Sequence, residues 1–276
     1  MFCTAAAVSF TGRVRKNNED NYCIDAEALP LDHGDSAPMI RELESNRPHL
    51  VGVFDGMGGC RDGEQASFLA ACATQRRAGQ LEKRRDAREL LEALCLEAND
   101  IICAAADGSQ MGTTCALLYL YGNRYTICNV GDSPVFLLRG GALYQLSQEH
   151  TQRSSYEAVT GKPAPRERKF PLTQCLGIPR EELLIQPFAR TGSLLSGDVF
   201  LLCSDGITDM LPPETIRKIL SEGGAERIVS ALARAALDAG GRDNLTALCV
   251  TVPSAKNGVM NRLLRRISGG AGKEMP

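Results

Sequence analysis

The chain has 276 residues, of which 43% are hydrophobic and 23% charged, and its formal net charge is −2. These values are typical of a globular protein that is long enough to bury a core without disulfides or a structural metal. The charge argues against a global basic field for nucleic acid or an anionic membrane, and no apolar run is long enough to span a bilayer.

Eleven cysteines are present, and most of them lie in apolar stretches. That distribution is typical of small buried side chains in a reducing compartment rather than of a disulfide framework. No pair of cysteines has the C-x-x-C spacing of thiolate zinc sites. The N-terminus lacks the charged start and long apolar stretch of a secretion signal. We therefore expect a cytoplasmic protein.

Short β-rich runs dominate the chain. Gly122-Asn123 separates two of them and indicates a hairpin. In chain order, we expect strands over residues 7–10, 21–25, 49–55, 113–121, 124–130, 135–138, 142–146, 183–190, 198–203 and 245–252.

Helices are fewer. We expect them over residues 64–77, 87–106, 214–220 and 225–239, with Asp86 as the N-cap of the second. Two adjacent helices between strands, and two more near the end of the chain, predict helices that cover a β core. This is an α+β arrangement rather than a strict β-α-β alternation.

Three regions look loosely structured. Residues 27–47 are predicted to be a long connection, and residues 152–173 a surface flap. Residues 254–276 form a Gly- and Lys/Arg-containing tail, which we expect to fray. The folded domain is therefore assigned to residues 1–253.

Carboxylates recur at the ends of predicted strands. The motifs contain Glu19-Asp20, Asp55-Gly56, Asp132, Asp205-Gly206 and Asp243-Asn244. A strand holds such an Asp rigidly, and a following Gly lets the backbone turn and approach a ligand closely. Carboxylates gathered at one sheet edge repel one another, and a shared divalent cation removes that penalty. Oxygen ligands favour Mg²⁺ or Mn²⁺. One Asp-Gly is usually only a turn, but five such motifs together with Arg15 predict a metal site.

The motifs also resemble, in order, those of the metal-dependent PP2C (PPM) serine/threonine phosphatases, particularly the bacterial branch. The matching segments are residues 12–20, 53–59, 111–114, 129–133, 202–211 and 243–246. The resemblance implies a four-layer αββα sandwich, in which two central, mainly antiparallel sheets are flanked by helix pairs. It also implies two Mn²⁺ or Mg²⁺ ions in the cleft between the sheets.

Site roles follow from the same resemblance. Asp55 would bridge both ions, and the Gly56 carbonyl would bind one of them. Asp205 and Asp243 would bind the other ion. The remaining implied residues are Glu19 and Asp20 on the second metal or its waters, Asp132 with Asp205 on a third, weaker metal, Arg15 on the substrate phosphate, and Asn244 in support.

The implied reaction is hydrolysis of phosphoserine and phosphothreonine by direct attack of a water that bridges the two ions, without a phosphoenzyme. Arg15, Asp55 and Asp205 would be the catalytic residues. The implied substrates are phosphorylated proteins, among them a cognate serine/threonine kinase, and we expect a monomer that binds no nucleic acid. One departure is Pro134, which stands where the family usually has Arg.

Other phosphatase classes and other acidic sites have different signatures. Cysteine-dependent phosphatases need a Cys with an Arg six positions later, and no cysteine here meets that condition. Calcineurin-like enzymes need several His ligands, whereas His33, His49 and His150 lie in no such motif. A catalytically weak relative that binds phosphoproteins in a regulatory role stays open, as does a hydrolase of small phosphate esters. A structural Ca²⁺ centre would favour ligands clustered in one loop, whereas these carboxylates are dispersed over most of the chain.

Overall fold

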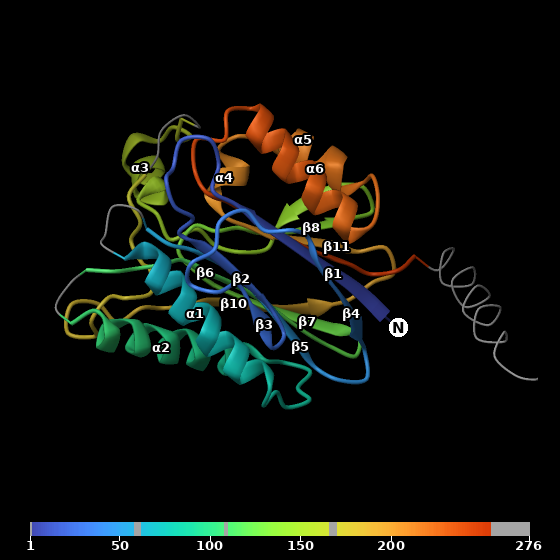
Figure 1. Cartoon of the computed structure of the whole chain (residues 1–276), viewed down its shortest axis with the longest axis horizontal. Coiled ribbons are helices and arrows are strands. Elements are labelled where there is room, and N and C mark those ends of the chain that lie inside the picture. Colours follow the sequence, from blue (N-terminus) through green and yellow to red (C-terminus); the bar gives the residue numbers. More distant parts are fainter. Residues whose placement is uncertain (1, 58–61, 108–109, 166–169, 255–276) are drawn as a thin grey trace, which may run out of the picture.

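The structure is a computed structural model, and it describes residues 2–57, 62–107, 110–165 and 170–254. Two six-stranded antiparallel sheets stack face to face, and helices cover both outer faces (Figure 1). The tail predicted over residues 254–276 lies outside the described residues, apart from Ser254. Within the described part of the chain, no helix is long and apolar enough to cross a membrane.

The first sheet, called the β1 sheet, has the strand order β4-β1-β12-β11-β8-β9. Its strands are β1 (Phe2–Phe10), β4 (Met39–Glu44), β8 (Val135–Arg139), β9 (Ala142–Gln145), β11 (Val199–Cys203) and β12 (Leu245–Thr251). The second, called the β5 sheet, has the order β10-β7-β6-β5-β2-β3. Its strands are β2 (Asp20–Ile24), β3 (Glu27–Ala28), β5 (His49–Asp55), β6 (Cys115–Tyr121), β7 (Arg124–Val130) and β10 (Phe188–Ser193).

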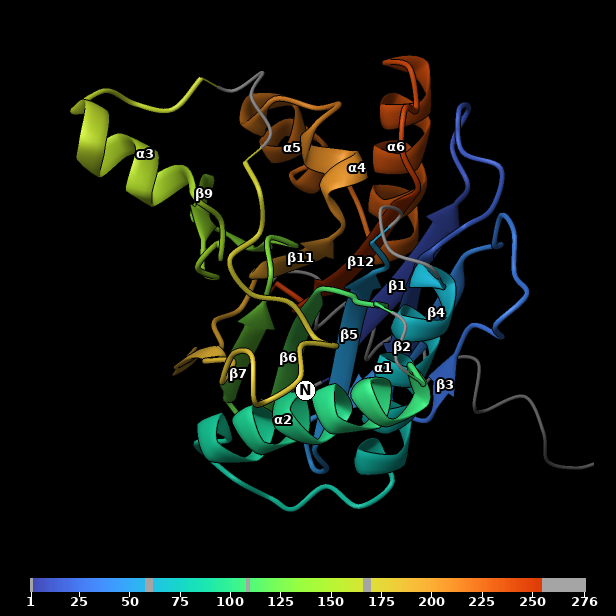
Figure 2. The same cartoon turned by 90° about the vertical axis from the view of Figure 1, so that its left-hand side faces the viewer.

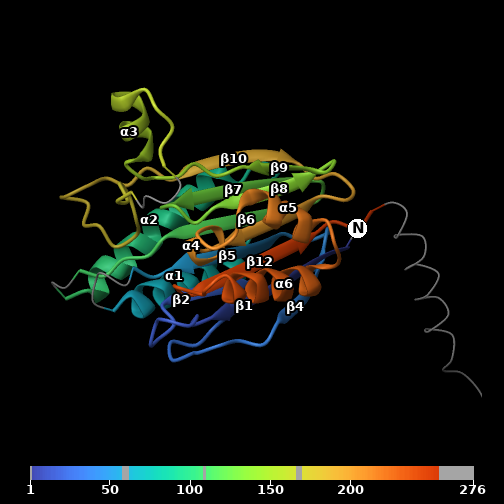
Figure 3. The same ribbon diagram turned by 90° about the horizontal axis from the view of Figure 1, so that it is seen from above.

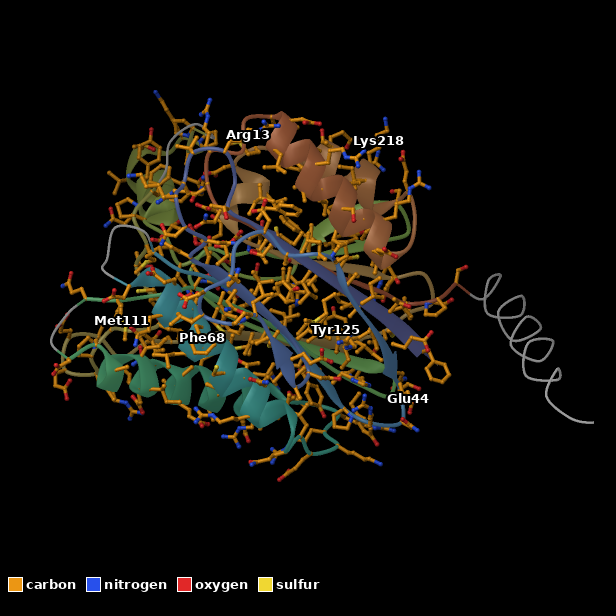
Figure 4. The ribbon with its side chains drawn as sticks, viewed as in Figure 1. Arg13, Glu44, Phe68, Met111, Tyr125 and Lys218 are labelled. Atoms are coloured by element: carbon orange, nitrogen blue, oxygen red, sulfur yellow. The ribbon has the colours of Figure 1, made fainter. Side chains whose placement is uncertain are left out.

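Three apolar layers hold the elements together. The inner faces of the two sheets form the central layer, which contains Tyr125 (Figure 4). The ring of Tyr125 meets that of Phe200 edge-on, with 5.0 Å between the ring centres. Helices α1 (Gly63–Ala78) and α2 (Arg88–Ala105) pack on the outer face of the β5 sheet. Helices α5 (Pro213–Leu220) and α6 (Ala225–Asp238) pack on the outer face of the β1 sheet (Figure 3). The predicted αββα sandwich is therefore confirmed.

The predicted elements match most of the structure, but β1 begins at Phe2 rather than at residue 7, and β3 and the short helix α4 (Asp205–Thr208) were not predicted. Three further differences concern the connecting regions. The region expected to be a long connection contains β4, whose alternating side chains pair with β1 at the sheet edge. The strand expected over 183–190 is shifted to Phe188–Ser193, because that stretch pairs with β7. The flap contains a short helix, α3 (Arg153–Thr160), which projects away from the two sheets (Figure 2).

Asp86 was wrongly predicted to be the N-cap of α2. The N-cap position is Ala87, which makes no side-chain capping bond. The Asp86 carboxylate instead accepts a hydrogen bond from the Arg88 backbone N–H at 3.1 Å. It therefore still satisfies one of the unpaired donors of the first turn.

The cysteine prediction agrees with the structure. Ten cysteines lie in the described ranges, and all ten are free thiols. The buried ones are Cys3, Cys23, Cys95, Cys115, Cys128, Cys175, Cys203 and Cys249. These side chains pack as small apolar groups, and no disulfide links the elements that the structure describes.

Candidate metal and phosphate site

The predicted site residues meet at one end of the two sheets. In the β5 sheet, β5 ends at Asp55 and its antiparallel neighbour β2 begins at Asp20, and these two residues are direct partners in the strand register. In the β1 sheet, β11 ends just before Asp205 and its antiparallel neighbour β12 begins just after Asp243. Stacking of the sheets brings the two pairs of strand ends together. The backbone nitrogen of Asp205 lies 3.4 Å from Oδ2 of Asp55.

Asp20 and Asp55 are carboxylates in a low-dielectric setting. The side chain of Asp20 is 1% exposed, and burial raises its pKa to about 7 even though the Ser204 hydroxyl donates to its Oδ2 at 2.7 Å. Burial also raises the pKa of Asp55 well above its ordinary value, and the neighbouring charge of Asp20 adds to the effect, followed by that of Asp205. Both groups would ionise far more readily beside a cation.

The remaining acidic residues surround this pair. Asp132 follows β7, and its charge also contributes to the raised pKa of Asp55. Glu19 immediately precedes β2, and partial burial raises its pKa. Its carbonyl oxygen accepts a hydrogen bond from the Gly56 N–H at 3.1 Å.

Two glycines allow the chain segments to approach this closely. A Cβ atom on Gly56 would lie 2.4 Å from the Glu19 carbonyl oxygen, and one on Gly206 would lie 2.0 Å from that of Asn244. Both distances are far shorter than any real contact of a Cβ atom. The glycines in the two Asp-Gly motifs are therefore required by packing between strand ends, in addition to the turn that the sequence indicates.

Arg15 lies in the loop after β1, and its side chain reaches Asp243, which lies just before β12. Its Nη2 donates to Asp243 Oδ2 at 2.8 Å, and its side chain is 39% exposed. The guanidinium is thus fixed beside the carboxylates but open to solvent. A fixed, exposed guanidinium fork of this kind is suited to binding two oxygens of a phosphate.

Asn244 ties the Arg15 loop to the acidic edge. Its Oδ1 accepts the Glu19 N–H at 2.9 Å, and its Nδ2 donates to the carbonyls of Thr11 and Asn17, each at 2.9 Å. The side chain is buried, so all three bonds are shielded from water. Asn244 therefore sets the position of the loop that carries Arg15 and Glu19.

Sequence reasoning missed four residues that hold Asp20 and Asp55 in place, one through a carboxylate and three through the backbone. Ser204 binds Asp20, and Thr114 Oγ1 accepts the Asp55 N–H at 3.1 Å. Both lie within the recognised motifs, and Ser204 directly precedes Asp205, so membership of those motifs was a usable signal. The other two are Asn18, whose Oδ1 accepts the Asp20 N–H, and His33, whose Nε2 lies 2.7 Å from the Asp20 carbonyl oxygen.

His33 had no signal in the sequence, because it lies in a loop 13 residues beyond its partner. The other two histidines are structural. His49 binds Asp25 at 2.7 Å, and the Nδ1 of His150 accepts the Gly131 N–H at 3.2 Å. Burial lowers the pKa of His150, which suits this neutral, accepting role.

The donor set fits hard divalent cations. The candidate ligands at the edge are carboxylate and carbonyl oxygens, and two of the carboxylates are buried and repel each other. In the part of the chain that the structure describes, no three His, Cys, Asp or Glu side chains already form a group that could hold a metal. Mg²⁺ usually keeps several waters and needs only one or two carboxylates, so this spacing is compatible with such a site.

A family model described as protein phosphatase 2C matches residues 40–248. The chain belongs to this family. It is 30% identical over 262 residues to the serine/threonine phosphatase stp of Listeria welshimeri, a match that covers 87% of this chain and 92% of that protein. It is 31% identical over 257 residues to the serine/threonine protein phosphatase PstP of Mycobacterium tuberculosis, and the match covers 90% of this chain but only 44% of PstP.

The PP2C fold is also found among solved structures. A crystal structure of the catalytic domain of PstP in complex with two manganese ions superimposes with a TM-score of 0.73 at 28% identity, and the match covers 92% of this chain and 100% of that one. The family predicted from the sequence, and with it the class of protein phosphatases, is confirmed. The individual site residues are brought together by the fold, and their roles stay predictions.

Proposed function

We propose that this chain removes phosphate from phosphoserine and phosphothreonine in proteins, using two Mn²⁺ or Mg²⁺ ions. The observation that carries the proposal is the convergence of Asp20, Asp55, Asp205 and Asp243 on one edge, with the Arg15 guanidinium beside them. Relatives named as serine/threonine phosphatases and the manganese-bound PstP structure support it.

Each group of residues has a distinct role in this proposal. Asp55, the Gly56 carbonyl, Asp205 and Asp243 would hold the ions directly. Glu19 and Asp20 would act on the second ion or on its waters. When bound, the ions would supply a water activated for direct attack on phosphorus and would offset the charge of the phosphoryl group.

Arg15 would bind and orient the phosphate. Its exposed fork lies 2.8 Å from Asp243, so a bound phosphate would share the guanidinium with that carboxylate. Two parallel N–H···O bonds would hold the ester in one orientation relative to the acidic edge. Asn244 would act as a positioning residue, because it fixes the Arg15 loop without reaching the open side of the site.

A third, weaker ion is proposed for Asp132 and Asp205. Both residues line one groove beside the acidic edge, which supports a shared position. The substrates would include a cognate serine/threonine kinase, and the enzyme would act as a monomer. The free thiols of the described cysteines support the expected cytoplasmic, reducing setting.

The test is phosphate release by the purified chain from a phosphothreonine peptide, with MnCl₂ and then with excess EDTA. We expect turnover only with the metal, and loss of turnover in Asp55→Asn while the circular dichroism spectrum stays unchanged. Full activity in excess EDTA would refute the metal mechanism. Tight peptide binding without phosphate release under any metal would favour the regulatory binding module instead.

A further inference from the structure

A buried asparagine on helix α2 bonds to a loop far along the chain. Asn99 is 2% exposed, and its Oδ1 accepts the N–H groups of Gly177 at 2.9 Å and of Ile178 at 3.2 Å. Its Nδ2 donates to the Ile178 carbonyl oxygen at 3.0 Å. All three bonds are made by one side chain to residues 78 and 79 positions further along. Because water is excluded from this side chain, the bonds fix the loop firmly against the helix.

This loop, called the anchor loop and defined as residues 176–178, is closely packed on its other side as well. Gly177 has a φ of +100°, and a Cβ atom on it would lie 2.1 Å from the Met111 carbonyl oxygen. The same Cβ atom would lie 3.0 Å from Cγ2 of Ile102, on α2. Leu176 is completely buried. The anchor loop therefore lies between α2 and the segment that leads into β6, and a close-packed interior transmits a shift of one neighbour to the other.

The anchor loop pairs with Thr113 through the backbone. The Thr113 N–H donates to the Leu176 carbonyl oxygen at 3.1 Å, and the Leu176 N–H donates to the Thr113 carbonyl oxygen at 2.9 Å. The two residues thus form an antiparallel bridge outside the two sheets. Thr113 is itself completely buried, so its position depends on this bridge and on its other neighbours.

Thr113 in turn holds the strand end that carries the proposed metal ligands. Its Oγ1 donates to the Asp55 carbonyl oxygen at 2.9 Å, and the Thr114 N–H donates to the same oxygen at 2.9 Å. Thr113 also forms an antiparallel bridge with Gly56. A continuous path of hydrogen bonds therefore runs from Asn99 through the anchor loop and Thr113 to Asp55 and Gly56.

The phosphate side of the site is held by different bonds. Asn244 fixes the loop that carries Arg15, through the carbonyls of Thr11 and Asn17. Asn99 acts instead on the strand end that carries Asp55. Loss of the Asn99 side chain should therefore affect metal binding and phosphate binding unequally, which separates a positioning role from a general loss of stability.

We propose that Asn99 is a positioning residue for the metal site, which holds Asp55 and the Gly56 carbonyl in place through the anchor loop and Thr113. The inference rests on the proposed function, because these two groups are the ligands proposed there. Loss of a group that orients a metal ligand typically lowers metal affinity or activity by about ten- to a hundredfold. Asn99 acts through Thr113 and not on the carboxylate itself, so we expect an effect of about tenfold.

The first test compares the wild type with Asn99→Ala. In isothermal titration calorimetry, the dissociation constant for Mn²⁺ should rise about tenfold. The Mn²⁺ concentration that gives half-maximal hydrolysis of p-nitrophenyl phosphate should rise by the same factor, while KM at saturating Mn²⁺ stays within about a factor of two. An unchanged affinity for Mn²⁺ would overturn the proposal, and so would a rise in KM as large as the loss of metal affinity.

The matched control is Thr126→Val, at the other end of the same helix. Thr126 is 1% exposed, and its Oγ1 accepts the Ala87 N–H at 3.2 Å. This bond lies about 18 Å from Asn99 along α2, since each residue of a helix adds about 1.5 Å. Its loss should cost a similar free energy of unfolding, and the affinity for Mn²⁺ should stay as in the wild type. An equal loss of Mn²⁺ affinity in both variants would assign the effect to stability alone and overturn the proposal.

A second variant tests the middle of the path. Thr113→Val keeps the backbone bridge to Leu176 but removes the hydroxyl that donates to Asp55. It should also weaken Mn²⁺ binding. Because the two side chains act on the same strand end, the double variant Asn99→Ala, Thr113→Val should lose less affinity than the product of the two single losses. Losses that multiply exactly would show independent action and overturn the path.

Hydrogen exchange in EDTA reports on the path without metal or turnover. In Asn99→Ala, amide exchange should be faster than in the wild type for peptides that cover residues 176–178, 111–116 and 53–57, and unchanged for the loop of Arg15. Faster exchange confined to residues 176–178 would overturn the proposal. A wild type that binds Mn²⁺ with the predicted dependence on Asn99 but releases no phosphate would contradict only the proposed phosphatase function.

Discussion

Replacing Asp20 with asparagine should stabilise the metal-free protein. The Asp20 carboxyl has a pKa of about 7, mainly because of burial, against an ordinary 3.8. At a pH well below 3.8 the group is protonated in both the folded and the unfolded chain and has no effect. As the pH rises to 7, the unfolded chain ionises freely and the folded chain does not, so stability is lost progressively. The difference in pKa corresponds to about 4 kcal/mol above pH 7.

The asparagine side chain of this variant would carry no charge, and its Oδ1 could still accept the hydrogen bond from Ser204. We expect Asp20→Asn to exceed the wild type by about 4 kcal/mol in urea unfolding at pH 8 in EDTA, and by less than half as much at pH 5. In MnCl₂ the wild type should gain more stability than the variant, because the wild type keeps the Asp20 carboxylate as a ligand for the metal or its waters.

The control is Glu222→Gln, which removes an exposed carboxylate from the turn after α5 and should behave like the wild type at both pH values. A wild type equally stable at pH 5 and pH 8 in EDTA would refute the reasoning. So would an Asp20→Asn variant that is less stable than the wild type at pH 8, because the buried charge would then not be the dominant cost.

Three further predictions concern the residues around this carboxylate. Arg15→Ala should raise KM for a phosphopeptide at least tenfold with a smaller change in the affinity for Mn²⁺, as measured by steady-state kinetics and metal titration, because the guanidinium faces solvent beside Asp243. Asn244→Ala should lower the free energy of unfolding by about 2 kcal/mol, because the partly buried N–H of Glu19 loses its acceptor. Gly206→Ala should cost at least about 2 kcal/mol in urea unfolding, because its Cβ would lie 2.0 Å from the Asn244 carbonyl.

Each of these has an outcome that contradicts it. An unchanged KM in Arg15→Ala would remove that residue from phosphate binding, and Arg13→Ala, in the same loop but paired with Leu237 and Asp238, is its control. Wild-type stability of Asn244→Ala would mean that the loop has other supports. Normal stability of Gly206→Ala would show that β12 can move away from α4 (Asp205–Thr208).

The recognisable part of the site comes from short segments. An apolar strand that ends in Asp-Gly is visible within about ten residues, and β5 was predicted with its correct bounds on that basis. The hairpin of β6 and β7 was also predicted, because Gly122-Asn123 lies between two β-rich runs. Edge strand β4 was missed, because two of its three exposed positions carry glutamate and only pairing with β1 makes it a strand.

What the sequence determined by itself was therefore the kind of site: the acidic residues, their order along the chain, and the sandwich that their motifs imply. The tertiary structure decided which groups touch. The bond of Ser204 to Asp20 joins residues 184 positions apart, and that of Asn244 to Glu19 joins residues 225 positions apart. Contacts of such separation depend on how two sheets stack, and no local pattern encodes the stacking. The groove between β8, α5 and the flap has the same origin, because its walls come from segments that meet only in the folded chain.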